Sequence, residues 1–265
     1  MKLLILIFLS YSALYSTVYY SKVEPYEIKK ISSNVMGTVE KVNESLLGKK
    51  LSKEAYIRID DKLDQEELKS TNKKLIYLRE TLSTNEIILM NLQKLVEKKR
   101  INYKKIEAMK IKSSIEKDRE FYDVIASENS LLSTQKELNN LKIQIADLEL
   151  RSVQLLKSIQ DKTIENNTYI LYSLLVKEGE VVTKGTPLAT VVDTSKALLT
   201  IYLNLEDVKN SKNSYIYIDS KKTSYKIDRL LKIADSKNIS KYKAQIIIKA
   251  PKIFSQLMKI ELKAK

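Results

Sequence analysis

The sequence predicts a multidomain α+β protein in which a long antiparallel α-helical coiled-coil hairpin interrupts a β-rich region and is followed by more antiparallel strands. Two observations predict this fold class. Apolar residues recur every seven positions along two stretches that a short polar break separates, and short alternating strand patterns with glycine turns lie on both sides. A heptad stripe is narrow and must be buried against another such stripe. Two stripes of similar length therefore predict a hairpin.

The hairpin is defined by its two ladders of seam residues. The first ladder is Leu68, Leu75, Leu78, Leu82, Leu89, Leu92 and Val96, and the second is Val124, Leu131, Leu138, Leu141, Ile145, Leu148, Leu155 and Ile159. We expect helices from about Leu63 to Glu165, a hairpin domain over 63–163, and a reversal between Ala108 and Ser114. Each arm of ~45 residues would reach ~68 Å at 1.5 Å per residue.

The N-terminus has the pattern of a targeting segment. Lys2 precedes the apolar run Leu3 to Leu9, and small and polar residues follow up to Ser16. This pattern is typical of a secretory signal peptide over residues 1–16. The alternative is an uncleaved membrane anchor that reaches about Tyr20. Both interpretations predict that the rest of the chain is exported.

Composition limits the chemistry of the chain. The sequence contains no Cys, His or Trp, so thiol nucleophiles, disulfides and histidine metal ligands are excluded. The net charge of +14 is mixed with carboxylates along the heptads, and no basic run carries interleaved aromatics. We therefore expect no nucleic-acid partner. The carboxylate pairs Asp60-Asp61 and Glu66-Glu67 point in different directions on a helix, so we expect no enzyme activity, cofactor or metal.

Strand patterns bracket the hairpin. Before it, residues 35–42 and 55–60 alternate apolar and polar positions around a turn at Gly48. After it, Tyr169 to Val176 reads as a strand, and Gly179 and Gly185 mark two turns. The C-terminal third continues with runs that predict an antiparallel series, namely 197–203, 215–218, 224–227, 230–233 and 244–248.

These flanks resemble a known domain. The segment from Val176 through Gly179 and Gly185 to Leu188 looks like the second half of a biotinyl/lipoyl-like β-sandwich, and residues 35–39 with Gly48 and 59–60 resemble the first half. Thr168 stands where the second half usually begins with Gly. The resemblance implies a split lipoyl-like domain over 31–62 plus 164–196. It also implies a small β-barrel domain over 22–30 plus 197–265, which includes a strand around residues 26–30.

A hairpin inserted between lipoyl-like halves and followed by a β-barrel is the layout of HlyD-type membrane fusion proteins, also called periplasmic adaptors. The resemblance implies an adaptor in the periplasm, associated with the inner membrane, that acts in efflux or secretion. Its implied partners are an inner-membrane transporter of ABC or RND type, a TolC-like outer-membrane duct, and copies of itself in a trimeric or hexameric ring.

The tip of the hairpin carries the candidate site. Tyr103, Ile106, Ser113 and Asp118 resemble the family's motif for contacting the outer-membrane duct. Asn102 and Glu120 differ from that motif. Exposed rigid loops are where binding residues are expected. The alternative is that Tyr103 and Ile106 are seam residues, while Ser113 and Asp118 cap the second helix.

A second motif supports the alternative function. Residues 107–111, Glu-Ala-Met-Lys-Ile, match a biotin-acceptor signature, which would make the chain a biotin- or lipoate-bearing carrier with a swinging-arm lysine. An acceptor lysine belongs on an exposed turn between two strands. Here it lies at the end of a helical arm, far from both β halves, so we favour the adaptor.

Overall fold

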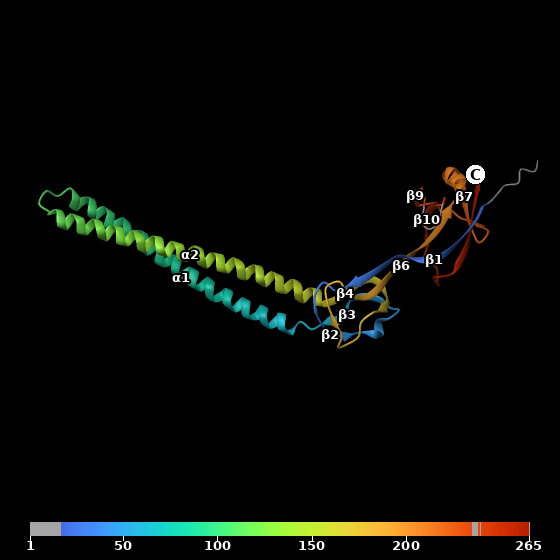
Figure 1. The fold of residues 1–265 in the computed structure, drawn as a ribbon, viewed down its shortest axis with the longest axis horizontal. Coiled ribbons are helices and arrows are strands. Elements are labelled where there is room, and N and C mark those ends of the chain that lie inside the picture. Colours follow the sequence, from blue (N-terminus) through green and yellow to red (C-terminus); the bar gives the residue numbers. More distant parts are fainter. Residues whose placement is uncertain (1–16, 235–237, 239, 265) are drawn as a thin grey trace, which may run out of the picture.

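The computed structural model describes residues 17–234, 238 and 240–264. The helical hairpin forms one end of an elongated molecule, a first β domain lies at its base, and a second β domain forms the opposite end (Figure 1). The expected signal peptide, residues 1–16, lies outside the described residues.

The hairpin consists of α1 (Lys62–Glu107) and α2 (Ser114–Lys162). All residues of both predicted ladders are buried or half-buried, with Leu75, Val96, Leu138 and Leu155 among the most buried. Many apolar residues of the hairpin outside the ladders are exposed instead, such as Ile76 and Leu132. The seven-residue spacing thus separates seam from surface, and the predicted coiled-coil hairpin is confirmed.

Arginine–glutamate pairs join the two helices along their length. Arg79 pairs with Glu149 at 2.6 Å, Arg100 with Glu128 at 2.6 Å, and Arg151 with Glu67 at 2.5 Å. Exposed pairs of this kind contribute little stability. They follow the antiparallel register that the buried seam imposes.

Helix α2 ends three residues before the predicted Glu165. Thr163 and Ile164 belong to β4, where they pair with Arg58 and Ile57 of β3. Their branched side chains favour the strand, and pairing with β3 decides the boundary.

The first β domain is built from two hairpin-like halves around the ends of the coiled coil. Its elements are β2 (Gly37–Val42), the 3₁₀ helix η1 (Glu44–Leu46), β3 (Lys50–Ile59), β4 (Thr163–Leu174) and β5 (Val181–Val182). Gly48, Gly179 and Gly185 have φ of 73°, 86° and 91° at its turns. Lys53 stands at the position corresponding to Gly185 and has φ of 45°.

Two long strands connect the β domains. β1 (Thr17–Ser32) and β6 (Pro187–Leu203) pair with each other from Val23 to Ser32, with a register shift after Pro25. The strand expected around residues 26–30 is thus the second half of a longer strand, which continues through Pro25 with only a register shift. Thr17 to Tyr20, which the anchor alternative included, pair with β11.

The second β domain adds strands on either side of β1 and β6. Its further elements are α3 (Leu205–Asn210), η2 (Ser211–Asn213), β7 (Ser214–Ile218), β8 (Lys221–Lys222), β9 (Arg229–Ala234), β10 (Tyr242–Lys249) and β11 (Leu257–Ala264). The order of this wall is β9-β10-β6-β1-β11-β7-β8. Within the described residues β7 and β9 do not pair, so the expected barrel has its strands but is not closed.

Each β domain has its own buried cluster. Val39, Leu51, Ile59, Leu171 and Leu188 belong to the first cluster. The second is formed by Val23, Leu199, Ile216, Ile246 and Ile260 with their neighbours. We propose that these clusters are the cores of the lipoyl-like and barrel domains, with the boundary near residue 196.

Candidate functional site at the tip of the hairpin

The reversal between the helices is short and ordered by hydrogen bonds. α1 ends at Glu107, and the backbone N–H groups of Ala108 and Met109 donate to the carbonyls of Lys104 and Ile106 at 3.3 and 3.1 Å. Lys104 and Lys105 lie in the last turn of α1, where positive charge is favourable. Six residues then lead into α2.

Ser113 begins α2 with a reciprocal cap. Its Oγ accepts from the N–H of Glu116 at 3.3 Å, and the Glu116 carboxylate accepts from the N–H of Ser113 at 3.0 Å. This is a capping box, which satisfies N–H groups that the helix leaves free. Lys112, through its hydrogen bond, and then Ser113 lower the pKa of Glu116 to about 2. The carboxylate is therefore ionised at neutral pH, and the tip is pre-ordered.

Tyr103 and Ile106 face the seam beneath the turn, where both are half-buried. The Tyr103 ring packs against Phe121 of α2 with centroids 5.7 Å apart and planes tilted by 54°. Its hydroxyl donates to Glu107 at 3.1 Å. Desolvation, followed by this hydrogen bond, raises the pKa of Tyr103. These two residues join the helices just below the tip.

Asp118 is exposed and lies in the second turn of α2, beyond the capping positions. Among the described residues it makes no hydrogen bond or ion pair. The four candidate residues thus share one end of the hairpin but differ in role. Ser113 caps the helix, Tyr103 and Ile106 pack in the seam, and Asp118 is free to contact another molecule.

The sequence interpretation missed the most exposed apolar residues of the tip. Ile111 is 99% exposed and Ile115 is 79% exposed, and Met109 is half exposed. Lys110 and Lys112 alternate with them in the turn. An isoleucine in a polar break, outside either ladder, is the signal that could have revealed them. Such residues on a rigid turn suit contact with a partner.

The lysine of the biotin-acceptor signature, Lys110, is exposed in this turn. It belongs to the turn between α1 and α2. This turn is at the end of the hairpin far from the β domains (Figure 1). Lys110 therefore does not lie on the turn between strands that a carrier lysine needs.

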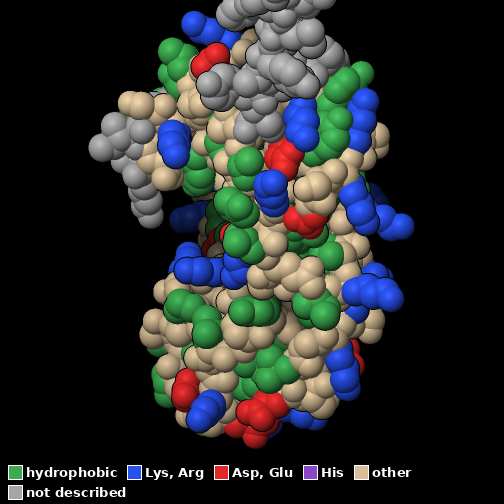
Figure 2. Space-filling view, turned by 90° about the vertical axis from the view of Figure 1, so that its right-hand side faces the viewer, with side chains coloured by type: hydrophobic (Ala, Val, Ile, Leu, Met, Phe, Trp, Pro, Cys, Tyr) green, Lys and Arg blue, Asp and Glu red, His purple; other side chains and the backbone are tan. Residues whose placement is uncertain are grey.

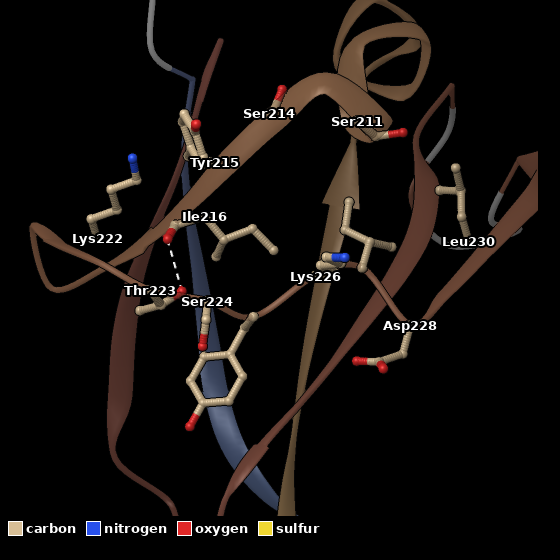
Figure 3. A pocket seen from close by; sticks show the side chains of 12 residues that line it. Ser211, Ser214, Tyr215, Ile216, Lys222, Thr223, Ser224, Lys226, Asp228 and Leu230 are labelled. Carbon is tan, nitrogen blue, oxygen red and sulfur yellow. Dashed lines mark hydrogen bonds between the residues drawn. The ribbon is translucent and has the colours of Figure 1, made fainter. Parts of the chain in front are cut away.

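A cavity of about 820 Å³ lies at the unpaired seam of the second β domain. The side chain of Ile216 points into it, while Tyr215 and Lys222 lie together at one edge (Figure 3). The carboxylate of Asp228 accepts from the N–H of Ile247 at 2.7 Å. The segment from Thr223 to Asp228 crosses the gap, and Thr223 is tied to the carbonyl of Ile216 at 2.8 Å. This segment takes the place of a strand pairing between β7 and β9.

Residues 17–234, 238 and 240–264 contain no group of three or more acidic, His or Cys side chains placed to hold a metal. Within the same residues no helix is both long and apolar enough to cross a membrane.

The sequence matches no protein-family model and no curated protein. Solved structures do match. MacA from Actinobacillus actinomycetemcomitans is 17% identical and aligns over 94% of this chain and 78% of its own, with a TM-score of 0.71. The membrane fusion protein Spr0693 from Streptococcus pneumoniae R6 is 13% identical over 94% and 100% of the chains, with a TM-score of 0.63.

A MacA–MexA chimera that contains the α-hairpin domain of Pseudomonas aeruginosa MexA matches as well. It is 15% identical over 94% of this chain and 82% of its own, with a TM-score of 0.59. At such identities the similarity concerns the fold. The chain has the fold of a membrane fusion protein, and the predicted resemblance to HlyD-type adaptors is confirmed at this level.

Proposed function

We propose that this chain is a non-enzymatic periplasmic adaptor that connects an inner-membrane transporter of ABC or RND type to a TolC-like outer-membrane duct. The observation that carries the proposal is the pre-ordered tip at the end of a long hairpin. Helices of 46 and 49 residues span about 70 Å at 1.5 Å per residue. A hairpin of this length can connect two partners that do not touch each other.

The two ends of the molecule offer different surfaces. The β domains lie at one end of the molecule, and the hairpin tip lies at the other (Figure 1). We assign the β domains to the inner-membrane side and the tip to the duct. In this arrangement the chain catalyses no reaction. It encloses the channel between the transporter and the duct and transmits movements of the transporter.

Exposed apolar residues along α2 support a ring of several copies. They lie outside the seam, on the surface of the hairpin, and include Leu132, Ile143, Leu150, Val153 and Leu156. Several apolar side chains exposed on one long helix favour burial against a neighbour. We propose that adjacent hairpins of a trimer or hexamer pack through this surface.

Replacement of Asp118 tests duct contact, because this residue supports nothing within the described chain. Asp118→Trp should abolish export in cells and leave the melting temperature unchanged. Glu86→Trp is the control, since Glu86 is also an exposed carboxylate of the hairpin without a described partner and lies on α1, outside the apolar surface of α2. Normal export with Asp118→Trp, together with failure of a cysteine at residue 118 to crosslink to a duct protein, would overturn the proposal.

A further inference from the structure

The outer face of the second β domain, at β1, β11 and β7, carries a regular arrangement of tyrosines and lysines. Tyr20 lies opposite Lys259, and Tyr217 pairs with both Glu261 and Lys222 in neighbouring strands. Lys263 lies opposite Tyr215. We call this the Tyr/Lys face, defined by Tyr20, Tyr215, Tyr217, Lys222, Lys259 and Lys263.

Strand alternation directs these side chains away from the core. The intervening residues Ile216, Ile260 and Leu262 are buried in the domain core. Because successive side chains of a strand point to opposite sides, the Tyr/Lys face is the outer side of the same strands. Tyr20 is 62% exposed. Lys and Arg side chains are also widespread over this end of the molecule, with fewer Asp and Glu (Figure 2).

Lysines and tyrosines of the face contact each other directly. The Nζ of Lys222 lies 3.4 Å from the centroid of the Tyr215 ring, and the Nζ of Lys263 lies 4.5 Å from that of Tyr217. Among the described residues Lys222 has no ion-pair partner, so its ammonium can contact an anion, whereas Lys263 also pairs with Glu261. The pairs thus present positive charge and aromatic rings together on one side of the sheet.

Negative charge within the face is already neutralised. Glu261 is 6% exposed and forms ion pairs with Lys259 at 2.5 Å and Lys263 at 2.8 Å. Asp219, at the border, accepts a hydrogen bond from the backbone N–H of Lys259 at 3.0 Å. The lysines exceed the carboxylates, so the face remains positive.

Apolar side chains complete this surface. Val18 lies opposite Glu261, and Leu257 lies opposite Lys22, and both apolar side chains are exposed. Tyrosine with lysine and scattered aliphatic groups is the composition found at membrane–water interfaces, where the rings lie among headgroups. Lysines near such a surface are attracted by anionic lipid.

We propose that the Tyr/Lys face binds the surface of a membrane through anionic phospholipid headgroups. Lysines contact the phosphates, while the tyrosine rings and the exposed aliphatic side chains enter the headgroup layer. If the apolar run Leu3 to Leu9 is retained as an anchor, it holds this face near a membrane, because it precedes β1 by only seven residues. The face does not depend on the proposed contact with a duct.

Vesicle sedimentation tests the inference with the full chain. Vesicles of phosphatidylcholine with and without phosphatidylglycerol are the probes. The wild type should bind the anionic vesicles more tightly, and high salt should weaken that binding. The double variant Lys222→Gln/Lys263→Gln should lose binding by about 25-fold, because each lysine near an anionic surface contributes about fivefold. Tyr20→Ser should reduce binding to both kinds of vesicle.

The control is Lys74→Gln/Lys142→Gln, which removes two exposed lysines without described partners from the hairpin. All variants retain the N-terminal apolar run, so any difference between them reports on the face. If the double variant is unfolded, the proposal is tested by the wild type alone, through the dependence of its vesicle binding on anionic headgroups and on salt. Equal wild-type binding to neutral and anionic vesicles would overturn the proposal. Unchanged vesicle binding by a folded double variant would also overturn the proposal. If that variant in addition no longer co-purifies with a transporter, the face is a protein interface instead.

Discussion

Lys162, the last residue of α2, and Asp64, in the first turn of α1, form an ion pair of 3.1 Å at the base of the hairpin. Their side chains are only 10% and 18% exposed. Ser158 donates a further hydrogen bond to Asp64 at 2.6 Å. Desolvation raises the pKa of Asp64, but Ser158, Lys162 and Arg151 together outweigh it, so the pKa is lowered. This contact fixes where the two helices leave the β domain.

Asp64→Asn should destabilise the protein by about 2 kcal/mol, because it leaves the buried Lys162 ammonium without its counter-ion. Chemical denaturation at neutral pH measures the loss. Glu66→Gln is the control, since it breaks a pair with Lys69 that is largely exposed and should cost under about 0.5 kcal/mol. The lowered pKa makes the contribution of Asp64 complete above its unfolded value of about 4, and it is lost as the pH falls further. Equal stability of wild type and Asp64→Asn at neutral pH would contradict this account.

The sequence predicted the hairpin because burial in a coiled coil follows a simple period. Leu75 and Leu131 belong to the predicted ladders and are buried and half-buried, whereas Ile76 and Leu132, which directly follow them, are exposed. Local composition alone does not distinguish these neighbours, but the heptad does. The split β domain was recognised for a similar reason, because Gly179 and Gly185 mark turns that need positive φ.

Features that depend on distant pairing were not predictable. The end of α2 is set by β3, and the open seam between the β7-β8 end of the wall and β9 follows from how seven strands meet in space. At the tip, Ser113 was predicted both as a contact and as a cap. The capping geometry is observed, and the contact stays a prediction. Ile111 was missed because exposure of an apolar side chain in a turn has no periodic signal.

Thr168 has φ of 81°, a conformation that β-branched residues rarely adopt. This is the position where the resemblance implied Gly. Thr168→Gly should therefore raise stability by about 1 kcal/mol, since relief of backbone strain exceeds the greater entropy lost by Gly on folding. Thermal unfolding of the two proteins measures the difference. Thr163→Gly, in the same strand at an ordinary φ, should destabilise instead, and a gain of stability in that control would remove the basis of the argument.

Gly37 starts β2 in close contact with β3. A Cβ at this position would lie 2.6 Å from Cγ2 of Ile59, whose branched side chain is fully buried. Gly37→Ala should destabilise by about 1–3 kcal/mol through overpacking. The neighbouring Thr38→Ala, on an exposed side chain, should change stability by under about 0.5 kcal/mol. Equal denaturation midpoints for these two variants would contradict this account, because they would show that β2 and β3 move apart to accept the Cβ without a loss of stability.

The capping box predicts how the tip responds to acid. The pKa of Glu116 is lowered to about 2, so its contribution is complete above the ordinary value of 4.5 and is lost as the pH falls toward 2. Protection of the amides of Ile115 to Lys117 against hydrogen exchange should therefore decrease over that range. Glu116→Gln keeps a capping side chain but does not titrate, so its protection should not vary with pH in the same way.

Ser113 allows capping and partner contact to be separated. Ser113→Ala should lower the local stability at the start of α2 by about 1 kcal/mol, whereas Ser113→Asp should retain it, because aspartate is also a favoured N-cap residue. If Ser113 contacts the duct, as the family resemblance implied, both variants should impair export, since both alter the surface at this position. Hydrogen exchange at the tip and an export assay measure the two properties on the same proteins. Export that fails with Ser113→Ala but is normal with Ser113→Asp would assign Ser113 to capping alone, and recognition would then rest on the exposed Asp118 and Ile111.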